Sequence, residues 1–315
     1  MRRATAVACA NIALVKYWGK RDDALHLPEA PSLSIALDGL STTTTVELGA
    51  GRDSLLLDGV EARPEELRRA RLLLDAAGIG DRARIESRNS FPTAAGLASS
   101  ASGFAALAVA ACAAAGEERS VRDLSALARR GSGSAARSVA GGWAAWEDEF
   151  AEQVAPPDHV PLRAVIAVCG EGKKDVGSRD GMKLTRETSP YHAAFVSQCR
   201  RDYAEARRLL RDGDLSALGA LAERNALRMH ADALAADPPL LYWEPATVSC
   251  LHALRRLRQE GASAWATIDA GPHVVAICAP GDAPRVESTL RNLAGVRDVL
   301  ICAPAGAARI LEGGR

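Results

Sequence analysis

Four short segments of the sequence carry residues that could bind and transform an anionic ligand. The first runs from Pro92 to Gly103 and reads P-T-A-A-G-L-A-S-S-A-S-G. A polyphosphate needs inward-pointing backbone N–H groups, small side chains that let it approach, and the N-terminus of a helix. This segment offers all three. Access would come from Ala94, Ala95, Gly96 and Ala98, and hydrogen bonds or a magnesium ligand from Ser99, Ser100 and Ser102.

The first segment departs from two well-known phosphate-binding motifs. It lacks the G-K-[ST] end of a Walker loop, and it does not match the G-x-G-x-x-G fingerprint. The alternative is a buried helix whose small residues only permit close packing. The combination of small residues, hydroxyl groups and a following helix favours the phosphate-binding interpretation.

The second segment, Gly131 to Arg137, reads G-S-G-S-A-A-R. The hydroxyls of Ser132 and Ser134 precede a guanidinium group, which can grip a carboxylate or phosphate with two parallel hydrogen bonds. Taken alone, a solvated Gly/Ser loop on the surface is the stronger interpretation of this pattern.

The third segment, N-I-A-L-V-K-Y-W-G-K from Asn11 to Lys20, sets two lysines around Tyr17 and Trp18. Nearly all other basic residues of the chain are arginines, so a retained lysine suggests a need for a compact ammonium group. Aromatic rings between lysines also occur in nucleic-acid-binding proteins. The neutral net charge of the chain favours a small anionic ligand instead.

The fourth segment, T-I-D-A-G-P from Thr267 to Pro272, carries Asp269 where a short apolar strand enters a turn. An aspartate that initiates a turn is common, and alone this is the stronger interpretation. The functional alternative is a general base, or a carboxylate that orients a hydroxyl group.

Composition excludes several classes of protein. The chain of 315 residues has 39 basic and 39 acidic residues, so no overall field attracts nucleic acid or an anionic membrane. Its seven cysteines are scattered, which fits reduced thiols and a cytoplasmic location. No apolar run approaches the roughly 18 residues of a membrane span. The histidines form no metal-binding pattern, and the G-x-S-x-G motif is absent.

Hydrophobic patterning predicts an α+β protein. In the first half we expect strands over 3–9, 42–48 and 82–87, helices over 64–77, 99–115 and 121–130, and a strand with a glycine bend over 138–147. In the second half we expect a strand over 162–169, a charged loop to 182, helices near 191–211, 214–230, 246–260 and 282–293, and strands near 264–268, 273–278 and 296–302. This order favours an antiparallel sheet in a second lobe.

The polar, proline-rich stretch 156–161 is the best candidate boundary between two lobes. We therefore predict an N-terminal lobe over 1–160 and a C-terminal lobe over 161–315, with Asp269 in the second. A ligand would then lie in the cleft between them.

Together the four segments resemble the GHMP small-molecule kinase superfamily, and in particular its diphosphomevalonate decarboxylase branch. The superfamily's P-x-x-x-G-L-x-S-S-A phosphate loop matches Pro92 to Ala101. Six further blocks are similar to the branch: A-N-I-A-L-V-K-Y-W-G-K-R-D at Ala10–Asp22, S-G-S-A-x-R-S at Ser132–Ser138, G-G-W-A-A-W-E at Gly141–Glu147, V-G-S-R-D-G-M at Val176–Met182, E-T-S-P-Y at Glu187–Tyr191 and D-A-G-P at Asp269–Pro272.

The resemblance implies a two-lobed GHMP kinase fold, with an N-terminal lobe like domain 2 of ribosomal protein S5 and a ferredoxin-like C-terminal lobe. It implies ATP-dependent decarboxylation of mevalonate diphosphate to isopentenyl diphosphate, with Mg²⁺, in a cytoplasmic homodimer. Neither a nucleic acid nor a membrane is implied as a partner.

The resemblance also assigns roles by position. Asp269 would face the tertiary hydroxyl, and Arg137 would hold the carboxylate that leaves as carbon dioxide. With Lys20 they form the expected catalytic set. The diphosphate would be held by Tyr17, Lys20, Ser132, Ser134, Ser178 and Arg179. ATP phosphates would lie on Ala94, Ala95, Gly96, Leu97, Ala98, Ser99, Ser100 and Ser102, with Ser100 as the magnesium ligand.

Two departures from the branch pattern stand out. His273 and Val274 follow the D-A-G-P turn where Asn and a small residue are usual, and His192 and Ala193 stand where an aromatic and a basic residue are usual. Three rival functions stay open: a decarboxylase or 3-kinase acting on mevalonate or its monophosphate, an ordinary small-molecule kinase, and a non-catalytic nucleotide-binding regulator.

Overall fold

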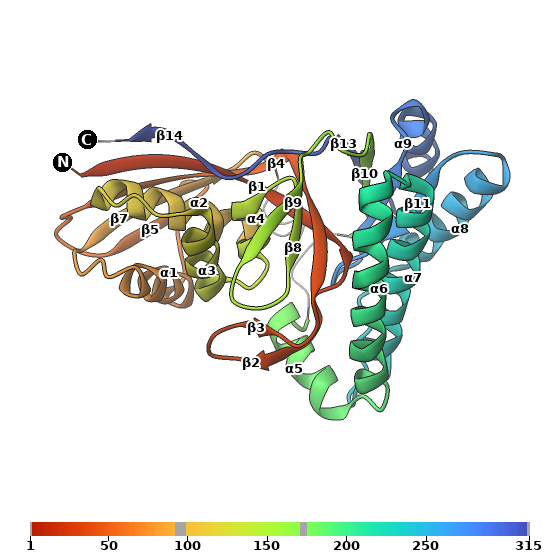
Figure 1. Ribbon diagram of the computed structural model, residues 1–315, viewed down its shortest axis with the longest axis horizontal. Coiled ribbons are helices and arrows are strands. Elements are labelled where there is room, and N and C mark those ends of the chain that lie inside the picture. Colours follow the sequence, from red (N-terminus) through yellow and green to blue (C-terminus); the bar gives the residue numbers. More distant parts are fainter. Residues whose placement is uncertain (1, 92–98, 171–174, 314–315) are drawn as a thin grey trace.

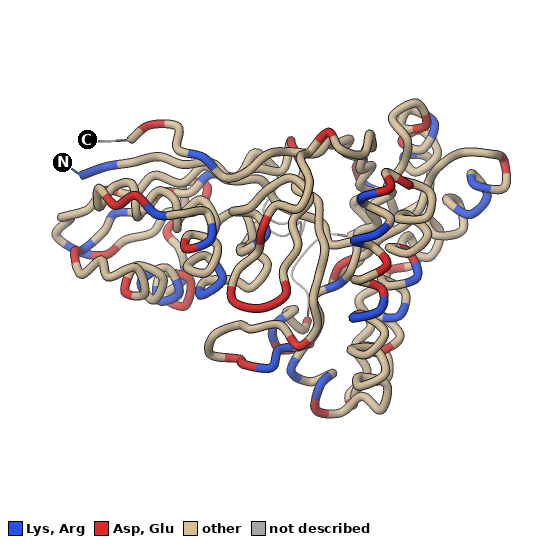
Figure 2. Tube along the Cα trace, in the orientation of Figure 1, with Lys and Arg blue, Asp and Glu red and all other residues tan. Residues whose placement is uncertain are grey.

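The structure is a computed structural model that describes residues 2–91, 99–170 and 175–313. Two lobes lie side by side (Figure 1). Basic and acidic side chains are interspersed over both lobes, as the balanced composition requires (Figure 2). The predicted division at residues 160 and 161 stays a prediction.

The first lobe is built on an eight-stranded sheet. Its main path runs β14-β1-β4-β7-β5-β6, and β8 and β9 extend from β4. The long antiparallel pair of β1 and β4 forms its centre. In the T-T-T-T-V-E-L run of β4, buried and partly exposed residues alternate, which is the pattern of a sheet with one covered face. The strands are β1 (Arg3–Val15), β4 (Ser32–Leu48), β5 (Ser54–Leu57), β6 (Val60–Glu61), β7 (Ala83–Asn89), β8 (Trp143–Trp146), β9 (Ala151–Ala155) and β14 (Arg309–Gly313).

Helices α1 (Pro64–Ala76), α2 (Ser99–Ala115) and α3 (Val121–Gly131) confirm the three helices predicted for this lobe. The run of alanines in α2 is buried on nearly every side, because small side chains let the helix lie close to β1 and β4. The phosphate-loop residues 92–98 lie outside the described residues, directly before this helix.

The prediction of a bent strand over 138–147 is wrong in its first half. Residues Ala135–Ala140 form the short helix α4, and strand β8 begins only at Trp143. The helix ends because Gly141 has φ +62°, a backbone conformation that suits glycine. Arg137 therefore projects from a helix and not from a loop.

The second lobe has a four-stranded antiparallel sheet, as predicted, in the order β11-β12-β10-β13. Its elements are β10 (Arg163–Val168), α6 (His192–Asp212), α7 (Leu215–Leu234), α8 (Pro245–Gln259), β11 (Ala264–Thr267), β12 (Val274–Cys278), the short 3-10 helix η2 (Pro280–Asp282), α9 (Ala283–Arg291) and β13 (Asp298–Cys302). The strand and helix positions match the predicted ranges to within a few residues.

Two small elements near the cleft were not predicted. The later half of the expected charged loop is the helix α5 (Ser178–Thr188), which begins after Gly177 in an extended conformation. A short hairpin of β2 (Lys20–Asp22) and β3 (Leu27–Pro28) follows the Asn11–Lys20 segment. The two elements lie beside each other below the lobes (Figure 1).

Two features join the lobes. A single hydrophobic cluster includes Leu14, Leu33 and Trp143 of the first sheet together with Ile166 and Leu221 of the second lobe. The last strand, β14 (Arg309–Gly313), returns to the first lobe and pairs with β1. On the way, residues 303–305 exchange backbone hydrogen bonds with β4 and with Gly142.

Candidate active site

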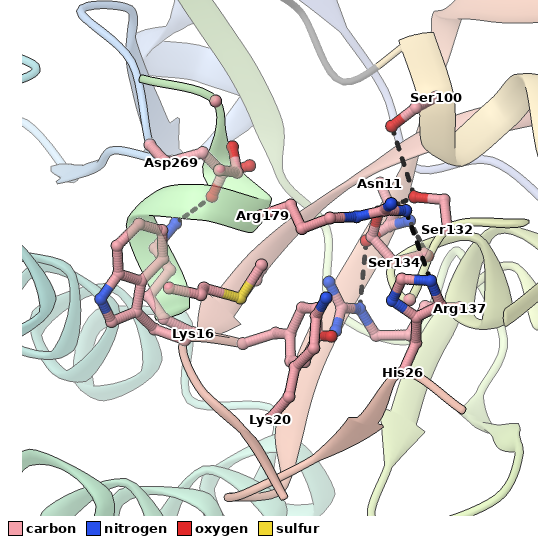
Figure 3. A pocket seen from close by; sticks show the side chains of 18 of the residues that line it. Asn11, Lys16, Lys20, His26, Ser100, Ser132, Ser134, Arg137, Arg179 and Asp269 are labelled. Atoms are coloured by element: carbon pink, nitrogen blue, oxygen red, sulfur yellow. Dashed lines mark hydrogen bonds and ion pairs between the residues drawn. The ribbon is translucent and has the colours of Figure 1, made fainter. Parts of the chain in front are cut away.

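A cleft of about 370 Å³ lies between the lobes and is strongly cationic. Five of the side chains that line it are basic and one is acidic (Figure 3). The lining brings together most of the predicted site residues, which come from distant parts of the chain: Tyr17, Lys20, Ser100, Ser132, Ser134, Arg137, Ser178, Arg179 and Asp269. An excess of positive charge in a concave site suits an anionic ligand.

Arg137 is a buried cation of the cleft, with 3% of its surface exposed. Its Nε donates to Asn11 Oδ1 at 3.1 Å and its Nη1 to Ser32 Oγ at 2.7 Å. Burial lowers the pKa of this guanidinium to about 10, although Asp269 and Tyr17 act in the opposite direction. Within the described residues Arg137 makes no salt bridge. A buried guanidinium without an ionic partner is a strong candidate for an anion-binding residue.

Asp269 follows β11 and forms an ion pair with Lys16, whose Nζ lies 2.6 Å from Oδ1. The Lys16 side chain is 1% exposed, whereas that of Asp269 is 46% exposed and reaches into the cleft. Burial lowers the pKa of Lys16, and the neighbouring carboxylate opposes this shift. Gly271 N–H donates to Asp269 O at 2.7 Å, so the predicted turn is also present.

Hydrogen bonds between the lobes hold Lys16 and Asp269 next to each other. Lys16 N–H donates to Asn225 Oδ1 of α7 at 2.8 Å, and Thr267 Oγ1 donates to Ala13 O at 3.1 Å. The end of β1 in the first lobe is thus hydrogen-bonded to α7 and β11 of the second. The Lys16–Asp269 pair sits where the two lobes meet (Figure 3).

Tyr17 and Lys20 supply donors on the first-lobe wall. The Tyr17 hydroxyl is buried and has no hydrogen-bond partner within the described residues, and burial raises its pKa, so it stays protonated. Its ring packs on Trp146, with centroids 4.7 Å apart. Burial, with Arg179 adding to it, lowers the pKa of Lys20 to about 8. Both side chains present hydrogen-bond donors to the cleft.

Three serines of the first lobe gather beside Tyr17. Ser132 Oγ lies 3.4 Å from Ser134 Oγ and 3.3 Å from Ser100 Oγ, although 32 positions separate Ser100 from Ser132 in the sequence. Ser178 and Arg179 stand at the N-terminus of α5, which faces the cleft. The positive end of that helix dipole adds to the attraction for an anion.

The predicted phosphate loop lies partly outside the residues that the structure describes. Ala94, Ala95, Gly96, Leu97 and Ala98 lie outside the described residues. Ser99 and Ser100 line a second cavity of about 170 Å³, and Ser100 lines the cleft as well. Ser102 is fully buried and lines neither space, but its Oγ lies 2.7 Å from Oγ1 of Thr42, which lines the second cavity. Its role in nucleotide binding stays a prediction.

The second cavity adjoins the cleft through Arg69 and Ser100, which line both. Leu55, Ile85 and Phe104 give it apolar walls, and the rim carries Asn89 and Glu66. The Arg69 guanidinium stacks 4.7 Å from the Phe104 ring centroid. An apolar slot next to a cationic cleft suits a ligand with a flat ring and a charged tail.

Sequence reasoning missed several lining residues, among them Asn11, His26 and Arg69. Asn11 stood inside a quoted motif, and its buried amide within an apolar strand was a usable clue. No clue in the sequence pointed to Arg69, because Arg63, Arg68 and Arg71 surround it in and beside an ordinary amphipathic helix. His26 lies on the hairpin, and burial with Lys20 and Arg179 lowers its pKa to about 3, so its ring is neutral.

The two departures from the branch pattern lie away from the cleft lining. His273 Nδ1 accepts a hydrogen bond from Cys169 N–H at 3.1 Å, at the end of β10. His192 is buried at the start of α6 between two carboxylates. Neither ring is among the residues that line the cleft.

Two further properties concern the described residues only. No group of three or more His, Cys, Asp or Glu side chains there could hold a metal ion. None of the helices described has the length and apolarity that a membrane crossing would require.

The fold and the cationic cleft define a two-lobed α+β protein of the GHMP kinase fold. Two family models match successive parts of the chain: "Diphosphomevalonate decarboxylase-like N-terminal domain" over residues 8–155, and "Mevalonate 5-diphosphate decarboxylase C-terminal domain" over residues 164–304. The diphosphomevalonate decarboxylase of Aspergillus fumigatus is 36% identical over an alignment of 330 positions, gaps included. The alignment covers 93% of this chain and 81% of that protein.

Solved structures agree. The mevalonate diphosphate decarboxylase of Staphylococcus aureus superposes with a TM-score of 0.93 and 35% identity, over 98% of each chain. A structure described as MDDEF in complex with MVAPP, AMPPCP and magnesium has a TM-score of 0.91 and 36% identity, over 98% of this chain and 99% of that one. The chain belongs to the diphosphomevalonate decarboxylase family, which confirms the resemblance drawn from its motifs.

Proposed function

We propose that this protein catalyses the ATP-dependent decarboxylation of (R)-5-diphosphomevalonate to isopentenyl diphosphate, with ADP, phosphate and carbon dioxide as co-products. The observation that carries the proposal is Arg137, a buried guanidinium without a salt bridge within the described residues, in a cleft that it shares with Asp269. A ligand that carries both a carboxylate and a diphosphate would neutralise Arg137 and the other cations of the cleft. Family membership supports the same activity.

The contacts of the cleft suggest how the ligand lies. The diphosphate would contact Lys20, Arg179 and the Tyr17 hydroxyl, with Ser132, Ser134 and Ser178 as further donors. The carboxylate would contact Arg137. The tertiary hydroxyl would then lie near Asp269, which accepts or orients its proton while phosphate is transferred to the oxygen.

Lys16 and Asp269, which form an ion pair, have different roles in this proposal. The Lys16 ammonium fixes the position of the Asp269 carboxylate through their 2.6 Å contact. Once phosphate departs, positive charge develops at the substrate's tertiary carbon, and the nearby carboxylate stabilises it. Loss of the carboxylate held by Arg137 then forms the double bond.

ATP would bind with its base in the second cavity and its phosphates toward the cleft, because Arg69 and Ser100 line both spaces. The solved relative with AMPPCP and magnesium supports ATP and Mg²⁺ as the nucleotide and metal. When bound, Mg²⁺ neutralises phosphate charge. Within the described residues no carboxylate cluster holds it, so the phosphates and the Ser100 hydroxyl would supply its ligands.

The setting of the reaction is part of the proposal. We expect the protein to act in the cytoplasm, which agrees with the scattered cysteines, all of them free in the structure. We also expect a homodimer. Sedimentation equilibrium of the purified protein would give twice the 33.1 kDa mass of the chain, and a monomer mass would exclude the dimer.

One experiment separates this function from its rivals. Purified protein is incubated with ATP, Mg²⁺ and, in parallel, mevalonate, its 5-phosphate or its 5-diphosphate. We expect ADP, phosphate and carbon dioxide in equal amounts from the diphosphate. Alkene from the monophosphate alone would identify a monophosphate decarboxylase. ADP without carbon dioxide would identify a kinase, and nucleotide binding without turnover would identify a regulator.

A further inference from the structure

A buried histidine at the start of α6 connects three parts of the molecule. His192 Nδ1 lies 2.8 Å from Asp232 Oδ2 of α7, and its Nε2 lies 3.1 Å from Glu29 Oε2 in the first lobe. The side chains of His192 and Asp232 are 6% and 1% exposed, and that of Glu29 is 28% exposed. Neither His192 nor Asp232 lines the cleft.

The geometry requires a charged imidazole. A neutral histidine has one N–H group, whereas both ring nitrogens here face carboxylate oxygens, which are acceptors when ionised. The hydrogen bonds to Asp232 and Glu29 raise the pKa of His192 in spite of its burial. Ser189 Oγ also donates to Asp232 Oδ1 at 2.6 Å, so this carboxylate is held from two sides.

The two carboxylates belong to different lobes. Asp232 lies within α7, whose position is set by the second-lobe core. Glu29 lies in the connection that follows the β2–β3 hairpin, and its backbone N–H donates to Gly19 O at 3.2 Å. His192 therefore ties the hairpin of the first lobe to a rigid part of the second.

The segment from Tyr17 to Glu29, which includes the β2–β3 hairpin, carries residues that line the cleft. Tyr17, Lys20 and His26 all line the cleft from this segment. At Gly19, φ is +113° and an added Cβ would lie 2.9 Å from Glu29 Oε2 and 3.1 Å from the His192 ring, so the backbone passes directly over the ion pair. A shift of Glu29 would move the backbone next to Lys20.

Two other second-lobe side chains hold the same segment. Arg186 of α5 donates to Lys20 O at 2.5 Å and forms an ion pair with Asp23 at 2.9 Å. Arg200 of α6 donates to Glu29 O at 3.0 Å. His192 is the buried member of this set, and its ion pair with Glu29 is the least exposed to screening by solvent.

We propose that His192 is a positioning residue: through its ion pair with Glu29 it holds the Tyr17–Glu29 segment against α6 and α7, and so sets the affinity of the cleft for the diphosphate group. The proposal rests on the proposed function. His192 acts on binding, because its contacts reach the diphosphate wall and not Asp269.

The test compares Glu29→Gln and His192→Gln with the wild type. Glu29→Gln keeps the shape of the side chain and removes only its charge. We expect the KM for diphosphomevalonate to rise about tenfold in each variant, the size expected when a charge-assisted hydrogen bond is lost. The kcat and the KM for ATP should stay within about twofold, because the loss affects ground state and transition state equally.

Two measurements do not depend on turnover. Calorimetric titration with inorganic pyrophosphate should give a Kd raised by about the same tenfold factor as the KM. Hydrogen exchange should be faster at the amides of residues 20–28, with α6 and α7 unchanged. The matched control is Glu205→Gln, which neutralises an exposed glutamate of α6 that pairs with Arg208. Its KM, Kd and exchange should equal those of the wild type.

The outcomes are distinct. Unchanged KM, pyrophosphate affinity and hairpin exchange in Glu29→Gln would overturn the proposal. Equal losses in kcat and in both KM values, with exchange raised throughout the protein, would mean that the ion pair serves stability only and would also overturn it. If the wild type releases no carbon dioxide, the proposed function fails, while pyrophosphate binding and hydrogen exchange still decide the role of His192.

Discussion

Single residues of the cleft differ in how far the sequence could predict them. Tyr17, Lys20 and Arg137 were predicted from the family resemblance, because each stands in a block that matches it, and all three line the cleft. The Lys16–Asp269 pair was not, since 253 positions separate the two residues and only the folded chain brings them to 2.6 Å. The same reason hid the pairing of His192 with Glu29, which lies 163 positions away.

At Asp269, replacement by Asn removes the proton acceptor while keeping the size of the side chain. We expect kcat to fall by about a thousandfold, within the range for loss of a positioned general base. ATP affinity, measured by fluorescence titration, should change less than threefold, because Arg69 and Ser100 are untouched. The control Asp212→Asn alters an exposed aspartate of α6 that pairs with Arg208. Substantial carbon dioxide release by Asp269→Asn would remove Asp269 from the proposed role.

At Lys20, the lowered pKa predicts a pH dependence. With a pKa of about 8 in the free protein, the side chain loses its proton as pH rises through 8, and the cleft loses a cation that attracts the diphosphate. The kcat/KM for diphosphomevalonate should therefore fall above about pH 8. In Lys20→Arg the group stays charged, so the fall should move to higher pH. An identical profile in both proteins would assign the titration to another residue.

At the scale of elements, long and regular segments were predicted well and short ones near the cleft were not. Helix α2 was predicted with its observed bounds, because its seventeen residues are mostly small and apolar and Gly116 follows them. Helix α4 has six residues and begins after Ser134, too few for a helical period to appear. The start of α5 was hidden because V-G-S-R-D-G-M has the composition of a loop.

In the turn between α4 and β8, we expect one added methyl group to destabilise the protein strongly. In Gly141→Ala, φ of +62° would be strained and the new Cβ would lie 2.3 Å from the backbone of Gly306 and Ala307. We expect the free energy of unfolding in urea to fall by about 3 kcal/mol or more. Gly49→Ala shares the positive φ without neighbours within 4 Å, and should lose only about 1 kcal/mol. Equal losses of unfolding free energy in Gly141→Ala and Gly49→Ala would show that the contact with the backbone of residues 306 and 307 has no energetic cost.

At the scale of the whole molecule, the two lobes share one of their hydrophobic cores. Leu14 and Trp143 of the first lobe pack in the same cluster as Ile166 and Leu221 of the second. The two-lobed α+β architecture was predicted from element order and from the resemblance, and solved relatives confirm the fold. The shared core was not predictable, since sequence patterns mark buried faces and not the surfaces that they meet.

A shared core predicts that the lobes unfold together. Thermal unfolding followed by circular dichroism and by tryptophan fluorescence should give one coincident transition. Leu162→Ala, at a fully buried position of this core, should lower the free energy of unfolding by about 2–5 kcal/mol and shift both transitions equally. Leu311→Ala, at an exposed position, should shift neither. Two separated transitions would contradict a single cooperative unit.

The return of β14 to the first sheet has a mechanical consequence. The polypeptide crosses between the lobes once near residue 160 and again along residues 303–308, where it is hydrogen-bonded to β4, Gly142 and Val139. A body attached by one tether can swivel in any direction, whereas one fastened at two points can rotate only about the line through them. Together with the shared hydrophobic core, the second fastening therefore holds Asp269 and Arg137, which come from different lobes, in one relative position across the cleft.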